Sequence, residues 1–528
     1  MDRYVLGVHS GHDSSACLYK NNQLLYAIAR ERLTRKKHDS GEPIECIEYL
    51  LKAAGITYNQ ISLVVRVNWY DSTEINDDYY KKFSKVIVRY EHHLFHAYAA
   101  SLAAKFDKTL IYIMDGRGCR PVDNGCSSLS EEDLFEAESL YLLDNGEITE
   151  LQAEKKYAVH ESASNHKYKW GSHMDSIGYA YADVSRLIFK DYNAAGKVMA
   201  LAAYGVRNAD VPECLYFDKK LHVRKEWLEY LNAQDYPLSY ELQTAKNIAC
   251  ALQFELESYI QTRIKYFSEK YNVLDFCFSG GVALNCLNNG KLINSGLINS
   301  LGLFPASGDD GISIGAGLWA IRKIFKDKSK IEWDYALGKS YGEICHDEDE
   351  SVLFQVIKDI HDDKIIGLFE GGSEYGPRAL CNRSIIASAK SKNMKDRLNL
   401  QIKHRENFRP FGGVILERNL KKITDDRIAS PLMLSAINIK PEMIDYMPAL
   451  VHKDNTVRIQ VIYENQNKKL IWKILDYLEK KYGELVLINT SFNGKGEPIV
   501  ESQSDALLSA KRMKLEYVYM NGEKVDII

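Results

Sequence analysis

The stretch "EHHLFHAYAA" (91–100) carries two histidines whose spacing could hold a metal ion. His92 and His96 are four residues apart, so on a helix they share one face, with Cβ atoms about 6 Å apart. Two imidazoles at that distance can bind one ion. A pair of helical histidines is also common on a surface or in a core, so the spacing alone leaves both interpretations open.

Carboxylates at the ends of other predicted elements favour the metal interpretation. Asp115 follows the strand-like "TLIYIM" (109–114), and Asp309 and Asp310 stand in a turn before a helix of small residues. In α/β proteins, ligands gather at the ends of strands. Two histidines with one or two carboxylates make a mixed nitrogen and oxygen site, which suits Fe, Mn or Zn.

A hairpin tip near the N-terminus also carries chemistry. "VLGVHSGHDSSACLY" (5–19) places His9, His12 and Asp13 between two apolar runs. A hairpin needs turn residues, but not two imidazoles and a carboxylate. Because free imidazole titrates near neutral pH, His12, or alternatively His9, could act as a general base. The other interpretation is that His12 only closes the turn through Asp13.

Two further stretches could bind an anion or a nucleotide. "SGGVALN" (279–285) offers backbone N–H groups at a predicted helix start. It lacks the spacing of a P-loop and could be a simple βα turn. "AAGKVMALAAYG" (194–205) sets Lys197 among small apolar residues, where its side chain either snorkels or pairs with an anion.

The C-terminal third is rich in arginine, amide and hydroxyl side chains among glycine, proline and phenylalanine. Arginine binds oxyanions bidentately, and hydroxyls and amides complete the shell. A solvated charged face would show acidic residues at helical spacing, so we expect an oxyanion pocket instead. Its candidate residues are Arg378, Asn382, Arg383, Ser384, Lys403, Arg405, Arg409, Arg458, Asn489, Thr490, Ser491 and Asn493.

The composition is that of an ordinary globular protein. The 528 residues are 45% hydrophobic and 27% charged, with a net charge of −4, which argues against a dedicated nucleic-acid binder. The basic run 29–38 is the exception, and we interpret it as a solvated helix end. Ten cysteines occur singly without a C-x-x-C pair. We expect no signal peptide, no membrane span and a cytoplasmic location.

The order of predicted elements favours an α/β fold. The sequence predicts two units that each consist of a strand, a polar tip and a second strand, and it predicts a glycine turn before a helix. This combination is typical of a two-lobed, actin-like nucleotide fold. Helical patterns follow at 43–56, 241–271 and 311–327. A polar stretch near 328–350 predicts a linker, and "KIIGLFEGG" (364–372) begins another α/β unit.

Nine motifs, in order along nearly the whole chain, resemble the O-carbamoyltransferase family of the NodU/CmcH (TobZ-like) type. That family acts in nodulation-factor and antibiotic biosynthesis. The motifs are "HDSSACL", "ERLTRKKHD", "HHLFHAYAA", "DGRG", "GKVMALAAYG", "SGGVALNC", "GPRALCNRSI", "RENFRPF" and "NTSFNGKGEPIV".

This resemblance implies a two-step, ATP-dependent enzyme. Residues 1–335 would form an actin-like (ASKHA, Kae1-like) domain that transfers a carbamoyl group. A linker region at 336–362 would lead to a YrdC-like domain at 363–528. That second domain would make carbamoyl adenylate from carbamoyl phosphate and ATP with Mg²⁺. The acceptor would be a hydroxyl of a small molecule or sugar, in natural-product or glycan biosynthesis.

The resemblance also assigns roles to residues. The metal ligands would be His92, His96, Asp115 and Asp309, around Fe²⁺ or alternatively Mn²⁺ or Zn²⁺. His12 would be the catalytic histidine, with Asp13 beside it. The remaining assignments concern binding of the adenylate, ATP and carbamoyl phosphate: Lys197, Met199, Gly280, Gly281, Asn285, Arg378, Lys403, Arg409, Arg458, Ser491 and Asn493.

Two positions depart from the family pattern. Some members carry an Asp two residues before the catalytic histidine, where this chain has Ser10. Ser10 would orient a base less well, unless Asp13 takes over that role. Cys381 stands where the family often has glycine.

Other protein classes share part of the pattern. A tRNA threonylcarbamoyl transferase shares the N-terminal fold, but the acidic balance and the second domain speak against a nucleic-acid acceptor. An actin-like sugar kinase or chaperone ATPase leaves the histidine pair and the C-terminal arginines without a role. An inactive binding module would have lost motif residues that are present here. We expect residues 116–180 to line the pocket for the acceptor, whose identity the sequence leaves open. The sequence also leaves the oligomeric state open, with a homodimer as one option.

Overall fold

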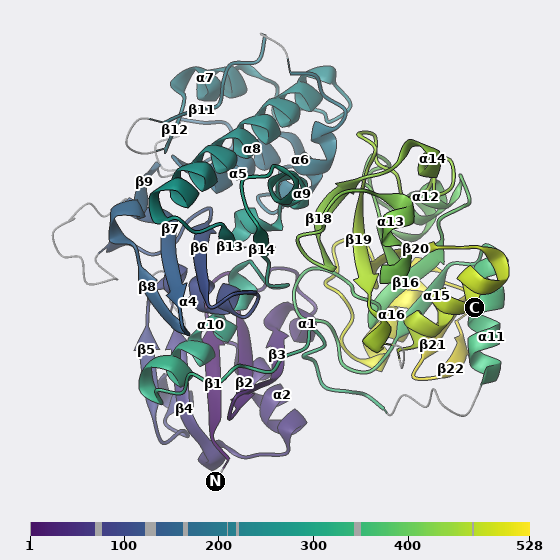
Figure 1. Ribbon diagram of the computed structural model, residues 1–528, viewed down its shortest axis with the longest axis horizontal. Coiled ribbons are helices and arrows are strands. Elements are labelled where there is room, and N and C mark those ends of the chain that lie inside the picture. The colour runs from purple at the N-terminus through teal and green to yellow at the C-terminus, as the bar shows by residue number, and fades with distance from the viewer. Residues whose placement is uncertain are drawn as a thin grey trace. The chain divides into compact units, whose positions relative to one another are not determined.

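The computed structural model describes residues 2–68, 77–121, 134–161, 167–207, 210–217, 221–342, 350–466 and 469–527 (Figure 1). The chain forms two compact units, each of mixed α/β structure. The first unit comprises Met1–Val64, Asn76–Lys85 and Ser329–Ile528, and the second comprises Val65–Ile75 and Val86–Lys328. None of the described helices is long and apolar enough to cross a membrane.

The N-terminal hairpin predicted from the sequence is confirmed. β1 (Tyr4–His9) pairs antiparallel with β2 (Ser15–Lys20), with the pair of His9 and Ser15 closing the ladder, so the chain turns between them. β2 also pairs with β3 (Gln23–Ala29). The sheet order is β3-β2-β1-β4-β5, in which β4 (Ile61–Val67) is the neighbour of β5 (Val86–Arg89).

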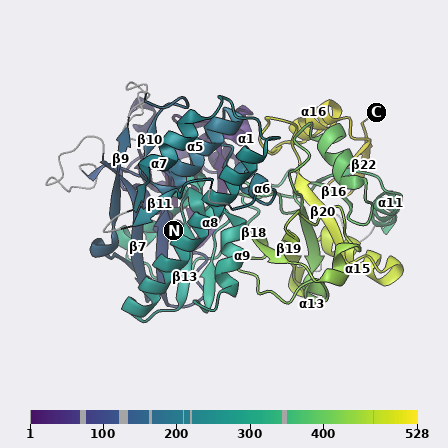
Figure 2. The same ribbon diagram turned by 90° about the horizontal axis from the view of Figure 1, so that it is seen from above.

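The C-terminal part of the first unit is built on a mixed sheet with helices on both faces. α15 (Leu470–Tyr482) and α11 (Glu350–His361) share one hydrophobic core with the sheet. α16 (Gln503–Met513) belongs to the core on the other face, as Figure 2 shows. The strands, in spatial order, are β18 (Leu432–Asn438), β19 (Thr456–Ile462), β17 (Gly412–Leu416), β20 (Val486–Ser491), β16 (Arg383–Ser388), β15 (Ile366–Phe369), β21 (Tyr517–Met520) and β22 (Glu523–Asp526).

The second unit is built on another mixed sheet. β6 (Lys108–Met114) and β13 (Asp275–Ser279) are parallel neighbours, so the loops that follow both strands leave the sheet at the same end. The strands, in spatial order, are β10 (His173–Met174), β9 (Lys156–Glu161), β7 (Leu134–Asp144), β6 (Lys108–Met114), β13 (Asp275–Ser279) and β14 (Ser300–Gly302), with β8 (Glu147–Glu150) on β7.

Helices surround this sheet. The long α8 lies beside α5, α6 and α9, which is visible in Figure 1, and α4 packs against α10. The bounds of these helices are α4 (His92–Ser101), α5 (Ile177–Phe189), α6 (Ala195–Ala202), α7 (Lys225–Ala233), α8 (Gln243–Tyr271), α9 (Cys286–Asn294) and α10 (Ile312–Trp319). Shorter helices of the first unit are α1 (Arg30–Thr34), α2 (Ile44–Ala54), α3 (Asp77–Tyr80), α12 (Met394–Asp396), α13 (Leu420–Ile423) and α14 (Pro441–Ile444).

Three helices predicted from periodicity appear as α2, α8 and α10. Part of the region assigned to a linker forms α11, whose Val356 and Ile360 are buried in the core on the sheet. Apolar residues at helical spacing within a polar stretch explain this packing. The domain boundaries 1–335, 336–362 and 363–528 stay a prediction.

The interpretation of 29–38 as a solvated helix end is wrong. Arg32 in α1 is buried and donates a hydrogen bond to the Gly376 carbonyl at 2.8 Å. Arg35 donates to the carbonyls of Pro498 at 2.8 Å and Ile499 at 2.7 Å. Guanidinium groups can serve several carbonyl acceptors at once, so this basic segment docks on the C-terminal part of the same unit.

Candidate metal centre and anion pocket

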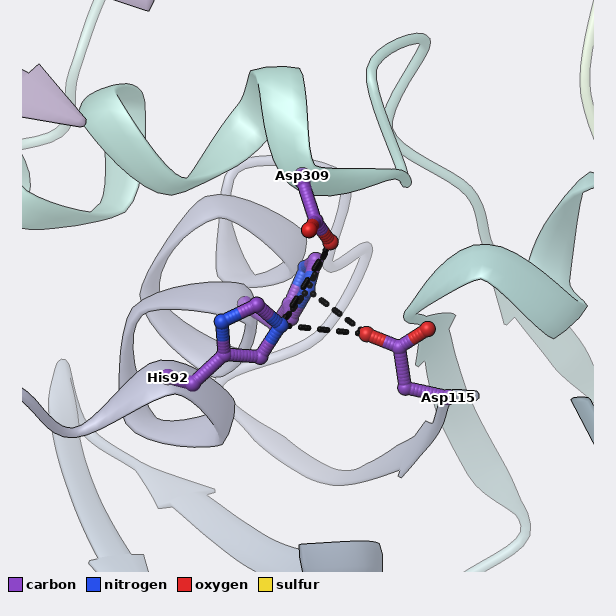
Figure 3. Close-up of side chains that lie close together, drawn as sticks. His92, Asp115 and Asp309 are labelled. Carbon is purple, nitrogen blue, oxygen red and sulfur yellow. Dashed lines mark hydrogen bonds and ion pairs between the residues drawn. The ribbon is translucent and has the colours of Figure 1, made fainter. Parts of the chain in front are cut away.

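Four side chains converge at the N-terminal end of α4. The Nε2 atoms of His92 and His96 are 3.2 Å apart. Asp115 Oδ2 lies 3.1 Å from His92 Nε2 and 3.4 Å from His96 Nε2. Asp309 Oδ1 lies 3.4 Å from His92 Nε2 and 3.5 Å from His96 Nε2. Figure 3 shows the side chains of His92, Asp115 and Asp309 pointing toward one another.

The donor set fits a divalent metal ion. Atoms that bind one ion from about 2.1 Å are about 3.0–3.4 Å from each other in octahedral or tetrahedral coordination. The distances among these four atoms are close to that range. Two imidazoles and two carboxylates suit Fe, Mn or Zn better than Mg or Ca, which prefer oxygen ligands. The group of four is mostly buried and could hold a metal ion.

Close packing of two helices brings the histidines to Asp309. Asp309 precedes α10, and a Cβ added to Gly315 on α10 would collide with the carbonyl oxygen of Phe95 on α4. Only glycine permits so close an approach of two helix backbones. The side chains of His92 and His96 therefore reach the turn that carries Asp309.

Backbone amides fix the orientation of Asp115. Its Oδ1 accepts hydrogen bonds from Gly116 N at 2.7 Å and Gly281 N at 3.2 Å, which leaves Oδ2 directed at the histidines. Gly280 has a φ of 89° and lies against the backbone of Met114, where a Cβ would collide with the Met114 carbonyl. The glycine turn after β13 thus supports a metal ligand, a role that its motif alone did not reveal.

The electrostatics of the cluster favour a cation. Burial by itself would lower the pKa of His92, but Asp309 and Asp115 outweigh it and raise that pKa to about 10. The pKa of His96 is raised for the same reason. Burial and mutual repulsion would raise the pKa of Asp115, yet hydrogen bonds from both histidines hold it below its usual value. Two carboxylates at one point need positive charge, which protons or a metal ion can supply.

One of the residues assigned to the adenylate, Gly281, contacts the metal-ligand candidate Asp115. Gly281 touches Asp115, and Asn285 caps α9 by accepting a hydrogen bond from Asn288 N at 3.1 Å. The next residue, Cys286, has its Sγ 4.0 Å from Met199 Sδ on α6. Lys197 lies on the same helix, with its ammonium 5.0 Å from the centre of the Phe189 ring. Gly280 and Gly281 thus begin the turn that ends at Asn285, and Met199 contacts the residue after Asn285.

A buried lysine organises the predicted oxyanion pocket. Lys403 Nζ donates to Asn493 O at 2.9 Å, to Asn493 Oδ1 at 3.0 Å and to the Ser491 carbonyl. Ser491 Oγ lies 3.5 Å from the same ammonium group. The structure therefore brings together three of the predicted residues, at the end of β20.

Arginines place more positive charge around Lys403. Burial, and then Arg405, Arg409 and Lys37, hold the pKa of Lys403 well below its usual value. Burial and the neighbours Arg409 and Arg458 lower the pKa of Arg405 to about 9. The Nε of Arg458 is buried without a hydrogen-bond partner among the described residues. Glu406 lies 3.5 Å from Arg409 and offsets part of this charge. Several buried positive groups held close together are typical of a site for an anion.

Arg383, another arginine of the C-terminal part, contacts backbone carbonyls. Arg383 donates to the carbonyls of Glu370 at 2.8 Å and Gly371 at 3.0 Å, so its guanidinium braces a loop rather than an oxyanion. Arg378 lies half-buried in that loop. Cys381, in the same loop, has a φ of 74°, a left-handed conformation that favours glycine.

The hairpin tip holds a carboxylate between two histidines. His12 Nδ1 lies 2.9 Å from Asp13 Oδ2, and His38 Nδ1 lies 2.8 Å from Asp13 Oδ1. A carboxylate therefore contacts His12 from Asp13, whereas position 10 carries a serine. His9 is buried, and its Nε2 lies 3.1 Å from the His12 carbonyl oxygen. Sequence reasoning missed His38, although it lies in the motif "ERLTRKKHD".

The predicted acceptor region 116–180 is only partly described, because 122–133 and 162–166 lie outside the described residues. Within it, a Cβ on Gly116 would lie 3.3 Å from the hydroxyl of Tyr192. The Tyr192 ring lies 5.7 Å from that of Tyr179, and Tyr179 lies 5.8 Å from His160. An aromatic row therefore approaches the backbone next to Asp115.

Comparison with known proteins gives matches along most of the chain. The family model described as "Carbamoyltransferase N-terminus" matches 4–79 and 72–318, and "Carbamoyltransferase C-terminus" matches 357–526. The chain is 27% identical to nodulation protein NolNO of Sinorhizobium fredii, over 94% of this chain and 76% of that protein. It is 33% identical to nodulation protein U of the same species, over 47% of this chain and 44% of that protein.

One solved structure shows how distant the structural matches are. HypF of T. kodakarensis has a TM-score of 0.42 at 13% sequence identity, over 62% of this chain and 48% of that chain. A TM-score at that level does not establish a shared fold.

Proposed function

The chain belongs to the carbamoyltransferase family, and on that premise we propose that it is an ATP-dependent O-carbamoyltransferase with two steps. Water first cleaves carbamoyl phosphate to carbamate and phosphate, and the carbamate oxygen then displaces pyrophosphate from the α-phosphorus of ATP to give carbamoyl adenylate. The carbamoyl group then passes to a hydroxyl of a small-molecule or sugar acceptor, in natural-product or glycan biosynthesis. An actin-like (Kae1-like) transfer domain and a YrdC-like domain are part of this proposal.

The adenylate-forming step uses the pocket around Lys403. Carbamoyl phosphate and ATP bring several negative charges, and Lys403, Arg409 and Arg458 offset them. Ser491 and Asn493, which contact the lysine, are placed to complete the shell. The depressed pKa of Lys403 supports this assignment, because a buried cation cluster is most stable when an anion is bound.

The convergence of His92, His96, Asp115 and Asp309 carries the proposal for the transfer step. We expect Fe²⁺ there, with Mn²⁺ or Zn²⁺ as alternatives, because all three accept mixed imidazole and carboxylate ligands. A bound divalent ion supplies a Lewis acid that polarises a carbonyl and offsets phosphate charge. We assign the adenylate to the turn from Gly280 to Asn285 and to Met199, which contacts the following Cys286.

His12 is the base that we assign to transfer. A hydroxyl is a poor nucleophile at neutral pH, and a positioned base contributes roughly 10²–10⁴-fold. The acceptor oxygen bonds to the carbamoyl carbon, its proton moves to the imidazole, and AMP leaves with the electrons of the broken C–O bond. The hydrogen bond between His12 and Asp13 supports this role, because it stabilises the imidazolium that forms.

One assay separates this function from its rivals. The full-length protein is incubated with ATP and carbamoyl phosphate, and the released products are identified. We expect pyrophosphate and carbamoyl adenylate, and mass spectrometry of an acceptor library should show a gain of one carbamoyl group. Release of ADP would support a sugar kinase instead. Salt-sensitive carbamoylation of tRNA would support a tRNA-modifying enzyme.

A further inference from the structure

The Asp13 carboxylate joins two imidazoles symmetrically. Burial by itself would raise the pKa of Asp13, but hydrogen bonds from His12 and His38 hold it below its usual value. Asp13 is therefore ionised and only accepts, so each histidine donates from Nδ1, and Nε2 is the nitrogen that can take up a proton. The two rings stack with centroids 5.5 Å apart and planes 18° apart.

The backbone around this cluster is firmly held. Asp13 and His38 have φ angles of 53° and 56°, in the left-handed region that few non-glycine residues adopt. Ser14 N donates to the Asp39 carbonyl at 3.1 Å, and Thr34 Oγ1 donates to Asp39 Oδ2 at 2.7 Å. Residues in such conformations persist only where the surroundings enforce them, and they gather at functional sites.

The segment that carries His38 is also anchored on the C-terminal part of its unit. Arg35 donates to the carbonyls of Pro498 and Ile499. The loop before them is tied to the anion pocket, because Asn493 Nδ2 donates to the Glu497 carbonyl at 2.6 Å. His38 is therefore held from both sides, by the hairpin tip and by the loop that follows the pocket.

We propose that His38 is a positioning residue for carbamoyl transfer. His38 occupies Oδ1 of Asp13, so that Oδ2 faces His12 Nδ1 and fixes the tautomer and ring orientation of His12. In this role His38 acts on the reaction only through Asp13 and His12. This inference rests on the proposed function of His12 as the base.

The test compares His38→Ala with His38→Asn in the full-length protein supplied with carbamoyl adenylate and an acceptor. His38→Ala should lower kcat about tenfold or more, with KM for the adenylate nearly unchanged, because orientation rather than binding is lost. His38→Asn should restore kcat to within about threefold of wild type, because its amide nitrogen can replace Nδ1 as the donor. His361→Ala, on α11, is the control and should match wild type.

Three outcomes would overturn this proposal. If His38→Asn is as slow as His38→Ala, or if both match wild type, the hydrogen bond to Asp13 does not position the base. If His38→Ala loses an equivalent of bound metal, the three side chains form a metal site instead. His12→Asn tests the underlying function separately: if it transfers as fast as wild type, the assignment of the base is wrong, whatever His38 does.

Discussion

Gly315 on α10 lies directly against the carbonyl oxygen of Phe95 on α4, with no room for a Cβ between the two helices. Phe95 precedes the metal ligand His96, and Asp309 begins the turn before α10. The contact therefore sets the distance between His96 and Asp309, two metal ligands that are far apart in the sequence.

Replacing this glycine should damage both stability and metal binding. Gly315→Ala must push the helices apart. We expect this to lower the free energy of unfolding by about 1–3 kcal/mol. Metal content by elemental analysis should fall with it. Gly196→Ala on α6 is the matched control, since nothing lies within 4 Å of its Cβ position. Equal melting temperatures and metal contents for the two variants would contradict the packing argument.

The metal assignment is tested by His96→Ala. The variant should lose bound metal and acceptor carbamoylation, because one of four ligands and part of the positive charge that balances Asp115 and Asp309 are gone. It should still make carbamoyl adenylate in the C-terminal pocket. His222→Ala, in the same unit but outside the cluster, should keep its metal. A His96→Ala protein with a full equivalent of metal would show that the ligand assignment is wrong.

Anion binding at Lys403 should take up protons. The pKa of Lys403 is below its usual value in the free protein, and a bound anion raises it. At a pH between the pKa of Lys403 in the free protein and its pKa in the complex, binding of the anion adds a proton to the lysine. The affinity for the anion therefore falls as the pH rises through that interval. Calorimetry with sulfate, which does not titrate there, in buffers of different protonation enthalpy measures the uptake. Lys403→Met should abolish it and Lys422→Met should not; uptake that survives in Lys403→Met would exclude this lysine as its source.

Cys381 offers a test of backbone strain. Its φ of 74° favours glycine, whereas its side chain is buried in the core on the sheet. Both Cys381→Gly and Cys381→Ala lose that side chain, but only glycine relieves the backbone, by about 1 kcal/mol. Cys381→Gly should therefore unfold at a higher denaturant concentration than Cys381→Ala. The reverse order would mean that the conformation is not strained.

Local patterns predicted much of the architecture. The apolar runs on either side of the tip predicted the β1–β2 hairpin, and helical periodicity predicted α2 and α8, because these features depend on neighbouring residues. The spacing of His92 and His96 predicted their shared face for the same reason. The assignment of Asp309 needed the family resemblance, since spacing alone left Asp310 equally suitable.

Contacts between distant residues could not be predicted. Asp13 meets His38 only because the loop after α1 returns to the hairpin tip, and Arg35 docks on Pro498, far along the chain. Arg383 looked like an anion ligand in the sequence, but its donors are used by backbone carbonyls. Residue type gives the chemistry a side chain can do, while the tertiary structure decides which partner it meets.

The most direct test of the two-step account follows carbamoyl adenylate in three proteins given ATP and isotopically labelled carbamoyl phosphate. Wild type should form it and pass the label to an acceptor. His96→Ala should form it without transfer, and Arg409→Ala should form none, yet transfer the label when carbamoyl adenylate is supplied. Arg418→Ala, whose arginine pairs with Asp476 on the surface, is the control and should match wild type. Loss of both activities in a folded Arg409→Ala protein, or adenylate formation at the wild-type rate, would contradict the account.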